Sequence, residues 1–278
     1  MNTAIFKKGD TIFELYTVEA GPYTGANANV YKVRHTLLGY ARAFIILHNP
    51  VYKDAFIQGA TLWSTFLGEA HSKNIVQFFE LLHAPEQAPC FIIEWLDGGP
   101  LDYWIDSGML YKGDDAQAAY SKILHIALQS AQGLLDMQKN GVIHRHVKPA
   151  NIMLGAQEGK DFSVKLSGLE VAVALDKKIE FAVKTPMYAP PEQLTGSVIN
   201  ASFSLDVFGW AASVMHMLAG KLLWKDGKEL SNTFDAIPAQ FKVYVPQSLI
   251  ELLKSATSLD ANCRPSWTHI IKLLKEIR

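Results

Sequence analysis

Short apolar runs separated by glycine, asparagine and proline dominate the first third of the chain. Runs of β-branched and aromatic residues between turn-forming residues predict the strands of an antiparallel sheet. The predicted strands are Ile12–Val18, Val30–Val33, Ala43–Leu47, Val76–Leu82 and Cys90–Ile93. One stretch of helical character, Lys53–Glu69, interrupts them.

From about residue 100 the apolar positions recur at helical spacing, which predicts a long helix with one wide apolar stripe. The stripe consists of Tyr120, Ile123, Leu124, Ala127, Leu128, Ala131, Leu134 and Leu135. Short strands are predicted after this helix, at Val142–Ile143, Ile152–Leu154 and Val164–Leu166.

Two later stretches also predict helices. Asp206–Leu218 is apolar nearly all round, as expected of a buried central helix. Ser266 is the predicted N-cap of a last helix that runs through Ile277. A β-rich first third joined to a helical remainder indicates an α+β protein with two lobes and a cleft near Glu94–Gly99. We predict one domain over residues 1–278, with an N-lobe at about 1–95, a hinge at about 94–99 and a C-lobe at about 100–278.

The composition is that of an ordinary globular protein with a well-buried core, since 49% of the residues are hydrophobic. The 26 basic and 27 acidic residues nearly cancel, which favours neither a nucleic-acid partner nor an anionic membrane surface. Two cysteines, Cys90 and Cys263, favour a reducing compartment. No apolar run approaches the roughly 18 residues that span a bilayer, and the start lacks a signal-peptide pattern. We expect a cytoplasmic protein with no membrane insertion.

One polar segment, His144-Arg145-His146-Val147-Lys148-Pro149-Ala150-Asn151, lies between the long predicted helix and a short strand. Other landmarks accompany it in a fixed order: Cys90-Phe91-Ile92-Ile93-Glu94-Trp95-Leu96-Asp97-Gly98-Gly99, Thr185-Pro186-Met187-Tyr188-Ala189-Pro190-Pro191-Glu192, Asp206 and Arg264-Pro265-Ser266. Together they resemble a protein kinase domain over essentially the whole chain, and the Lys148-Pro149 pair is similar to the serine/threonine branch. The resemblance implies a bilobal kinase-like fold, with an antiparallel sheet and one main helix in the N-lobe and a mostly helical C-lobe.

The resemblance also assigns structural roles. Asp206 is expected to hold the backbone of the catalytic loop, and Arg264 is expected to pair with Glu192. His144 is expected to pack inward beneath the metal-binding segment of the family.

Arg145 normally receives a phosphorylated activation loop in this family. Residues 171–184 contain no Ser, Thr or Tyr, which argues against switching by phosphorylation there. Glu180 is then the candidate partner of Arg145.

Several catalytic positions of the family carry other residues here. The strand Lys that reaches the phosphates of ATP is replaced by Ile45. The Glu that pairs with this Lys falls at Gly59 when the helix is aligned on Phe56, and at Trp63 when it is counted back from Asn74-Ile75-Val76. Glu69 lies too close to Asn74-Ile75-Val76 to serve.

The catalytic loop and the metal-binding segment depart from the family as well. His146 stands where the family has the Asp that receives the proton of the substrate hydroxyl. Gly168, Leu169 and Glu170 replace Asp-Phe-Gly, so Gly168 provides no metal ligand, while Lys148 and Asn151 are retained. We expect no metal site, and Asn151 is the one remaining candidate ligand.

The expected nucleotide-binding residues are mostly apolar. Of the glycines in the family's phosphate-covering loop only Gly25 survives when the segment is aligned on Val30, and Gly21 contributes only if the loop has an insertion. The candidate adenine and hinge contacts are Gly25, Val30, Ala43, Ile93 at the gatekeeper position, Glu94, Trp95 and Leu96.

These departures lead us to predict a pseudokinase, a protein kinase homologue without catalytic activity. Phosphoryl transfer depends on positioning and on charge stabilisation by metal ions and Lys, and several of these parts differ together. We predict that no cofactor is required, that ATP binds weakly or not at all, and that Mg²⁺ is not used. The predicted role is that of a scaffold or an allosteric regulator that binds another signalling protein, with no nucleic-acid partner.

Two alternatives remain open. In the first, the chain is a slow or non-standard nucleotide-dependent transferase that uses His146, Lys148 and Asn151. The imidazole of His146 would then replace the carboxylate as the base. A non-catalytic nucleotide sensor would bind adenine through the hinge backbone at Glu94 to Leu96.

Overall fold

The structure, a computed structural model, describes residues 6–67, 72–83, 88–112, 115–155, 162–175, 177–179, 186–194, 198–225, 228–229 and 235–278. The chain forms two compact units. The first comprises Met1–His71, Val76–Asp97 and Leu169–Val171, and the second comprises Ser72–Ile75, Gly98–Gly168 and Ala172–Arg278. Within the described ranges, no helix combines the length and the apolar character needed to cross a membrane.

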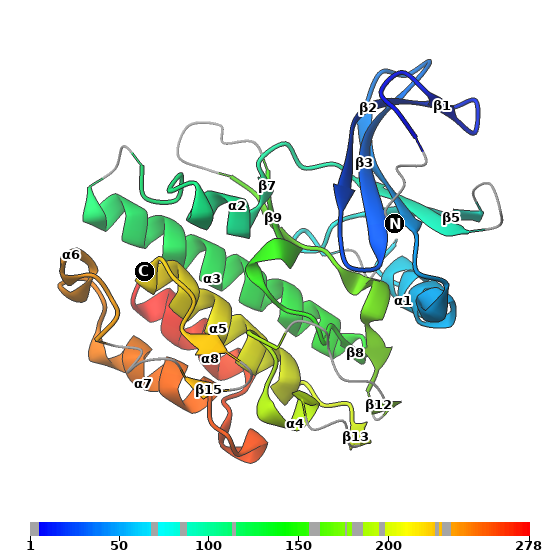
Figure 1. The fold of residues 1–278 in the computed structure, drawn as a ribbon. Helices are drawn as coiled ribbons and strands as arrows, with labels where there is room; N and C mark the ends of the chain where they lie inside the picture. The colour runs from blue at the N-terminus through cyan, green and yellow to red at the C-terminus, as the bar shows by residue number, and fades with distance from the viewer. Residues whose placement is uncertain are drawn as a thin grey trace. The chain divides into compact units, whose positions relative to one another are not determined.

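The first unit is built on a six-stranded antiparallel sheet with the strand order β1-β2-β3-β4-β6-β5 (Figure 1). The strands are β1 (Thr11–Ile12), β2 (Tyr16–Thr24), β3 (Ala28–His35), β4 (Ala41–Leu47), β5 (Phe78–His83) and β6 (Pro89–Glu94). The 3-10 helix η1 (Pro50–Tyr52) leads into α1 (Lys53–Ser64). A second 3-10 helix, η5 (Leu169–Val171), packs against α1. The predicted antiparallel sheet with one main helix is therefore confirmed.

One face of this sheet carries the core of the unit. Its buried side chains are Ile12, Tyr16, Val18, Tyr31, Val33, Phe44, Ile46, Cys90 and Ile92. Because successive strand residues point to opposite faces, Tyr31 and Val33 of β3 lie in this core while Val30 and Lys32 lie on the other face.

Helix α1 is anchored on the sheet by aromatic residues. The indole N–H of Trp63 donates a hydrogen bond to the backbone oxygen of Val76 at 2.7 Å. The ring of Phe91 stacks on Phe56 at a centroid distance of 4.6 Å and meets Trp63 edge-on at 5.6 Å. Such aromatic pairs add to the stabilisation that comes from burial alone.

Two predicted element boundaries are wrong. The predicted strand Ile12–Val18 is broken by a turn, because Phe13 and Glu14 both have left-handed backbone angles, with φ of 53° and 59°. These angles are incompatible with a strand. Helix α1 ends at Ser64, before the predicted end at Glu69, a residue that lies outside the described part of the chain.

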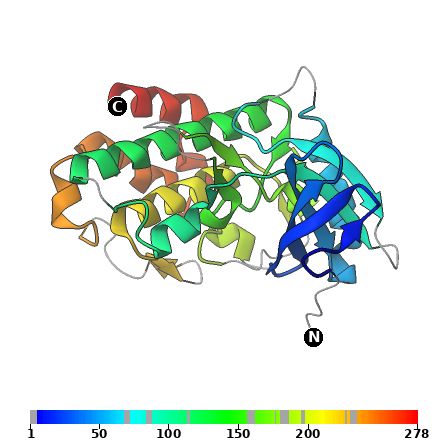
Figure 2. The same ribbon diagram turned by 90° about the horizontal axis from the view of Figure 1, so that it is seen from above.

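The second unit is mostly helical. Its longest helix, α3 (Ala116–Lys139), lies against α5 (Ser204–Ala219) and α8 (Trp267–Glu276) (Figures 1 and 2). The remaining helices are α2 (Leu101–Asp106), η4 (Pro149–Asn151), α4 (Pro191–Leu194), α6 (Ala239–Lys242), α7 (Gln247–Ala256) and η6 (Ala261–Cys263). The short strands are β7 (Gly99–Pro100), β8 (Val142–Ile143), β9 (Ile152–Leu154), β10 (Val164–Leu166), β11 (Val173–Ala174), β12 (Lys178–Ile179), β13 (Ile199–Asn200), β14 (Trp224–Lys225) and β15 (Lys228–Glu229).

Sequence patterns account for these helices. Every residue of α5 from Leu205 to Ala219 is buried, which confirms the predicted central helix. Helix α5 ends where Gly220 adopts a left-handed φ of 67°, the usual C-terminal signal. The hydroxyl of Ser266 accepts the N–H of His269 at 3.3 Å, so the predicted N-cap of α8 is also confirmed.

Candidate functional site

Asp206, in the first turn of α5, holds the backbone of the catalytic-loop segment. Its carboxylate accepts the N–H of His144 at 2.8 Å and the N–H of Arg145 at 2.7 Å. Arg145 has a left-handed φ of 64°, a conformation that surrounding contacts must maintain in a non-glycine residue. Burial raises the pKa of Asp206 to about 7, although the two N–H donors act in the opposite direction. The role predicted for Asp206 is confirmed.

His144 is fully buried and hydrogen-bonded through both ring nitrogens. Its Nε2 donates to the backbone oxygen of Ser167 at 2.8 Å, and its Nδ1 accepts the N–H of His146 at 3.2 Å. One donor and one acceptor define the neutral imidazole. Burial lowers the pKa of His144 to about 4, which favours the same form. The predicted inward packing of His144 is confirmed.

The rest of the loop places His146, Lys148 and Asn151 close together. The amide of Asn151 donates through Nδ2 to the backbone oxygen of His146 at 2.8 Å. The backbone N–H of Asn151 donates to the oxygen of Lys148 at 2.9 Å, which closes the 3-10 turn η4. Burial and the positive charge of Lys148 lower the pKa of His146 well below its usual value, so its imidazole is neutral near pH 7.

Gly168 lies directly beside Asn151 in the second unit. It has a left-handed φ of 79°, and a Cβ atom there would lie 2.5 Å from both Cγ and Nδ2 of Asn151. The Asn151 side chain therefore occupies the space that a larger residue at 168 would need. Across the described ranges, no three His, Cys, Asp or Glu side chains gather as a metal site. These residues do not fit the usual Mg²⁺ site of a kinase.

The predicted pair of Glu192 and Arg264 is confirmed. The guanidinium of Arg264 donates to the two carboxylate oxygens of Glu192 at 2.5 Å and 3.0 Å. It also donates to the backbone oxygens of Ser204 at 3.1 Å and Ser258 at 3.0 Å. Arg264 thus joins α4, α5 and the segment before α8. The amide of Gln193, next to Glu192, donates to the backbone oxygen of Arg145 at 3.2 Å.

The predicted partner of Arg145, Glu180, lies outside the described part of the chain. The same holds for Thr185, the first residue of the segment that ends at Glu192.

In the first unit, the candidate adenine contacts lie on neighbouring strands. Val30 pairs with Ile45, and Ala43 pairs with Ile93, so these four residues meet across β3, β4 and β6. Ala43, Ile45 and Ile93 are buried. In the connection after β6, the N–H of Leu96 makes no hydrogen bond with any residue that the structure describes, which leaves it available to a ligand.

Gly25 and Gly21 lie at different positions in the segment that aligns with the family's phosphate-covering loop. Gly25 closes the β2–β3 hairpin by donating its N–H to Ala28 at 2.9 Å. Gly21 lies within β2, where the register with β3 is irregular, and its φ is 112°. A Cβ atom at Gly21 would lie 2.8 Å from the oxygen of Val30, so glycine is required for strand packing at this position.

A polar cluster beside Leu96 was not predicted. The carboxylate of Asp97 accepts the ammonium of Lys32 at 3.0 Å and the indole N–H of Trp95 at 2.8 Å. The Lys32 ammonium also lies 5.2 Å from the centre of the Trp95 ring, and Tyr23 lies 6.2 Å from that ring. Hydrogen bonds from Lys32 and Trp95 lower the pKa of Asp97. The alternation of β3 indicates that Lys32 lies on the same face as Val30, but it does not identify Asp97 as its partner.

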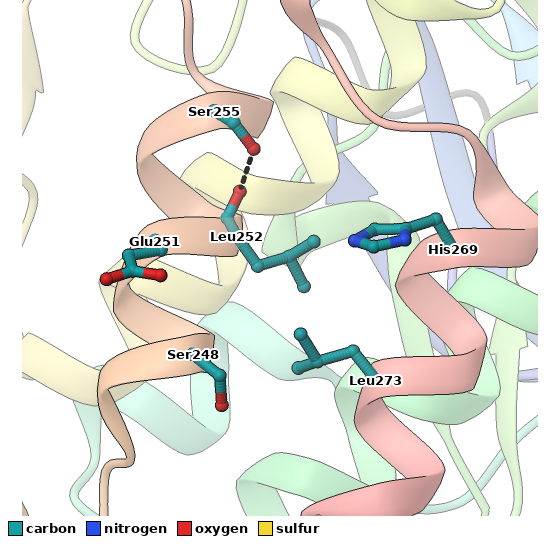
Figure 3. A pocket seen from close by; sticks show the side chains of 6 residues that line it. All are labelled: Ser248, Glu251, Leu252, Ser255, His269 and Leu273. Atoms are coloured by element: carbon teal, nitrogen blue, oxygen red, sulfur yellow. Dashed lines mark hydrogen bonds between the residues drawn. The ribbon is translucent and has the colours of Figure 1, made fainter.

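A hollow of about 330 Å³ lies elsewhere in the second unit, between α7 and α8 (Figure 3). Leu252 and Leu273 point toward each other across it, with His269 beside them. It is lined by Ser248, Glu251, Leu252, Ser255, His269 and Leu273. None of these residues belongs to the catalytic-loop segment, and their sequence gave no functional signal.

The comparisons with known proteins agree with this geometry. The family model described as the protein kinase domain matches residues 24–273. The chain therefore belongs to the protein kinase family.

The chain is similar to proteins that carry the name serine/threonine-protein kinase. Serine/threonine-protein kinase A of Synechocystis sp. is 25% identical over 273 residues, 89% of this chain and 50% of the relative. Pkn1 of Myxococcus xanthus is 27% identical over 215 residues, 73% of this chain and 28% of the relative. TOS3 of Saccharomyces cerevisiae is 25% identical over 201 residues, 68% of this chain and 35% of the relative. The chain thus spans half or less of each of these relatives.

The comparisons contradict two predictions made from the sequence. We predicted that the chain is not an enzyme, and the relatives are named as enzymes. We also predicted that no cofactor is required, with little ATP binding and no Mg²⁺, whereas protein kinases transfer a phosphoryl group from ATP with Mg²⁺. Both predictions relied on a few substituted positions, including Ile45, His146 and Gly168, and gave too little weight to the similarity along the rest of the chain.

Proposed function

We propose that the chain is a phosphotransferase of the serine/threonine-protein kinase class that uses ATP and acts on a protein. The observation that carries the proposal is the catalytic-loop segment, whose backbone Asp206 holds through His144 and Arg145. The similarity to named serine/threonine-protein kinases supports the same activity. The proposed partner is another signalling protein, and no nucleic-acid partner is proposed, because the net charge is close to zero.

In the proposed reaction, the bond between the γ-phosphorus of ATP and its bridging oxygen breaks, and a bond from phosphorus to a Ser or Thr hydroxyl oxygen forms. The hydroxyl proton passes to the neutral imidazole of His146, and ADP leaves. Lys148 supplies positive charge to the transferring phosphoryl group. A base with a depressed pKa accepts protons weakly, so we expect slow turnover. No step is assigned to a metal ion.

The first unit supplies the proposed site for the adenine base. The apolar side chains of Ala43 and Ile93 would contact the ring, and the N–H of Leu96 would donate a hydrogen bond to it. Flat heterocycles bind well to apolar walls that carry a few placed hydrogen-bonding groups. We also propose a location in the reducing cytoplasm, which is consistent with the absence of a disulfide at Cys90 and Cys263 in the part of the chain that the structure describes.

Transfer of labelled γ-phosphate tests the proposal. Wild-type protein is incubated with Mg·ATP and a mixture of protein substrates. We expect slow incorporation that Lys148→Met and Asn151→Ala reduce by about 10-fold or more, because both residues lie in the catalytic loop. Lys242→Ala, which removes an exposed ammonium on α6, is the matched control and should leave the rate unchanged.

Circular dichroism must first show that each variant is folded. Absence of transfer by folded wild-type protein with ATP or GTP, in Mg²⁺ and in Mn²⁺, would contradict the proposal. Equal rates for Asn151→Ala and wild type would also contradict it, because the transfer would then not occur at this loop.

A further inference from the structure

Gly59, in the middle of α1, lies unusually close to another segment of the first unit. A Cβ atom at this position would lie 2.4 Å from both the carbonyl carbon and the oxygen of Glu170, and 2.5 Å from the oxygen of Leu169. Side-chain atoms do not approach backbone atoms this closely. Only glycine therefore permits α1 and η5 to pack at their present distance.

The contact lies within a continuous buried face. Phe56 precedes Gly59 by one helical turn, and Ala60 and Trp63 follow it, so that these buried residues lie along one side of α1. Leu169 of η5 is completely buried as well. On the sheet side, the hydrogen bond from Trp63 to Val76 fixes the helix. Helix α1 thus contacts both the sheet and η5 through this buried face, and at Gly59 it meets the backbone of η5.

We propose that the close packing at Gly59 locks η5 to α1, so that the two segments unfold locally as one cooperative unit. The lock needs no side chain at position 59 and no ion pair with a neighbouring strand. The position of η5 relative to α1 is then built into the fold and does not await a ligand or a covalent modification. This proposal is independent of the proposed phosphoryl transfer.

The close packing of Gly59 against the backbone of η5 means that even alanine does not fit at this position without a shift of η5. The Cβ atom of alanine cannot turn away from η5, because its direction is set by the helix backbone. Atoms of Leu169 and Glu170 must therefore move when Gly59 is replaced. Alanine is also the better helix former, so the intrinsic helix propensity of α1 favours the variant. Faster hydrogen exchange at η5 in Gly59→Ala would therefore result from the lost packing contact and not from a weaker helix.

Hydrogen exchange followed by mass spectrometry tests the lock. We compare wild type, Gly59→Ala and Gln58→Ala, which removes an exposed side chain from the neighbouring position of α1. For Gly59→Ala we expect exchange of the peptide that contains η5 to rise by about tenfold or more, together with the peptide that contains α1. Gln58→Ala should match wild type. Unchanged exchange at η5 in folded Gly59→Ala would overturn the proposal.

Native-state exchange of the wild-type protein provides a second test if Gly59→Ala does not fold. Exchange of both peptides is measured at increasing urea below the unfolding transition. A locked pair should show the same opening free energy and the same dependence on urea. If η5 exchanges freely while α1 stays protected, the two segments move separately and the proposal is wrong.

Discussion

The carboxylate of Asp206 accepts the backbone N–H of His144 at 2.8 Å, across 62 residues of sequence. The other carboxylate oxygen accepts the N–H of Arg145. A buried carboxylate with two backbone donors fixes the start of the loop to the first turn of α5. The loop conformation therefore depends on a helix that follows it much later in the chain.

Replacing Asp206 by alanine should leave these two N–H groups without acceptors. We expect a loss of about 3 kcal/mol in the free energy of unfolding, because two buried backbone donors are costly to leave unpaired. Urea denaturation followed by fluorescence measures the loss. Asp235→Ala, at an exposed position, is the control. Equal midpoints for the two variants would show that Asp206 does not hold the loop.

The buried guanidinium of Arg264 should not tolerate replacement by lysine. Its donors reach both oxygens of Glu192 and the backbone oxygens of Ser204 and Ser258. An ammonium cannot reproduce this planar arrangement, and we expect Arg264→Lys to cost about 2–4 kcal/mol. Chemical denaturation compares it with Arg278→Lys, at an exposed position. If both variants are equally stable, the geometry of the guanidinium is unimportant.

Protonation of His144 at acidic pH should lower the free energy of unfolding. Its folded pKa is lowered by burial to about 4 from an unfolded value near 6.5. A lowered pKa means that the neutral form is favoured in the folded state, so the contribution of His144 to stability is present above pH 6.5 and is lost as the pH falls toward 4. The structural reason is that protonated Nδ1 would face the N–H donor of His146.

The contribution of His144 is measured as the difference in unfolding free energy between wild type and His144→Gln. We expect this difference to shrink by roughly 2 kcal/mol between pH 6.5 and pH 5. The difference is needed because the pKa of Asp206, raised by burial to about 7, gives the opposite trend, with stability falling as the pH rises toward 7. A difference that does not change with pH would show that His144 has an ordinary pKa.

Features that depend on neighbours along the chain were predictable from the sequence. The apolar stripe of α3, the buried helix α5 and the cap at Ser266 all follow from residues within a few positions of each other. The turn at Phe13 and Glu14 was missed because neither residue is a usual turn former, and their left-handed angles are imposed by the surrounding structure.

The site was predictable only where a family motif named its residues. The contacts of Asp206 and the pair of Glu192 and Arg264 followed from the resemblance. The cluster of Lys32 and Asp97 joins residues 65 positions apart, and no local pattern connects them. The contact of Gly59 with η5 is likewise made only in the folded chain. Periodicity indicates which face of an element is buried, but not which distant segment covers it.

Gly168 should be far less tolerant of alanine than Gly108, although both have the same left-handed backbone. Their φ angles are 79° and 74°, so each variant pays a similar conformational cost of about 1 kcal/mol. A Cβ atom at Gly108 has no other atom within 4 Å, whereas at Gly168 it lies 2.5 Å from the Asn151 side chain. That side chain must then move and give up its hydrogen bond to His146.

We therefore expect Gly168→Ala to cost about 1–2 kcal/mol more than Gly108→Ala, measured by urea denaturation of both variants under the same conditions. Asn151→Ala removes the colliding side chain, so the excess cost should vanish when Gly168→Ala is made in that background. An excess that persists without the Asn151 side chain would place the conflict elsewhere in the loop.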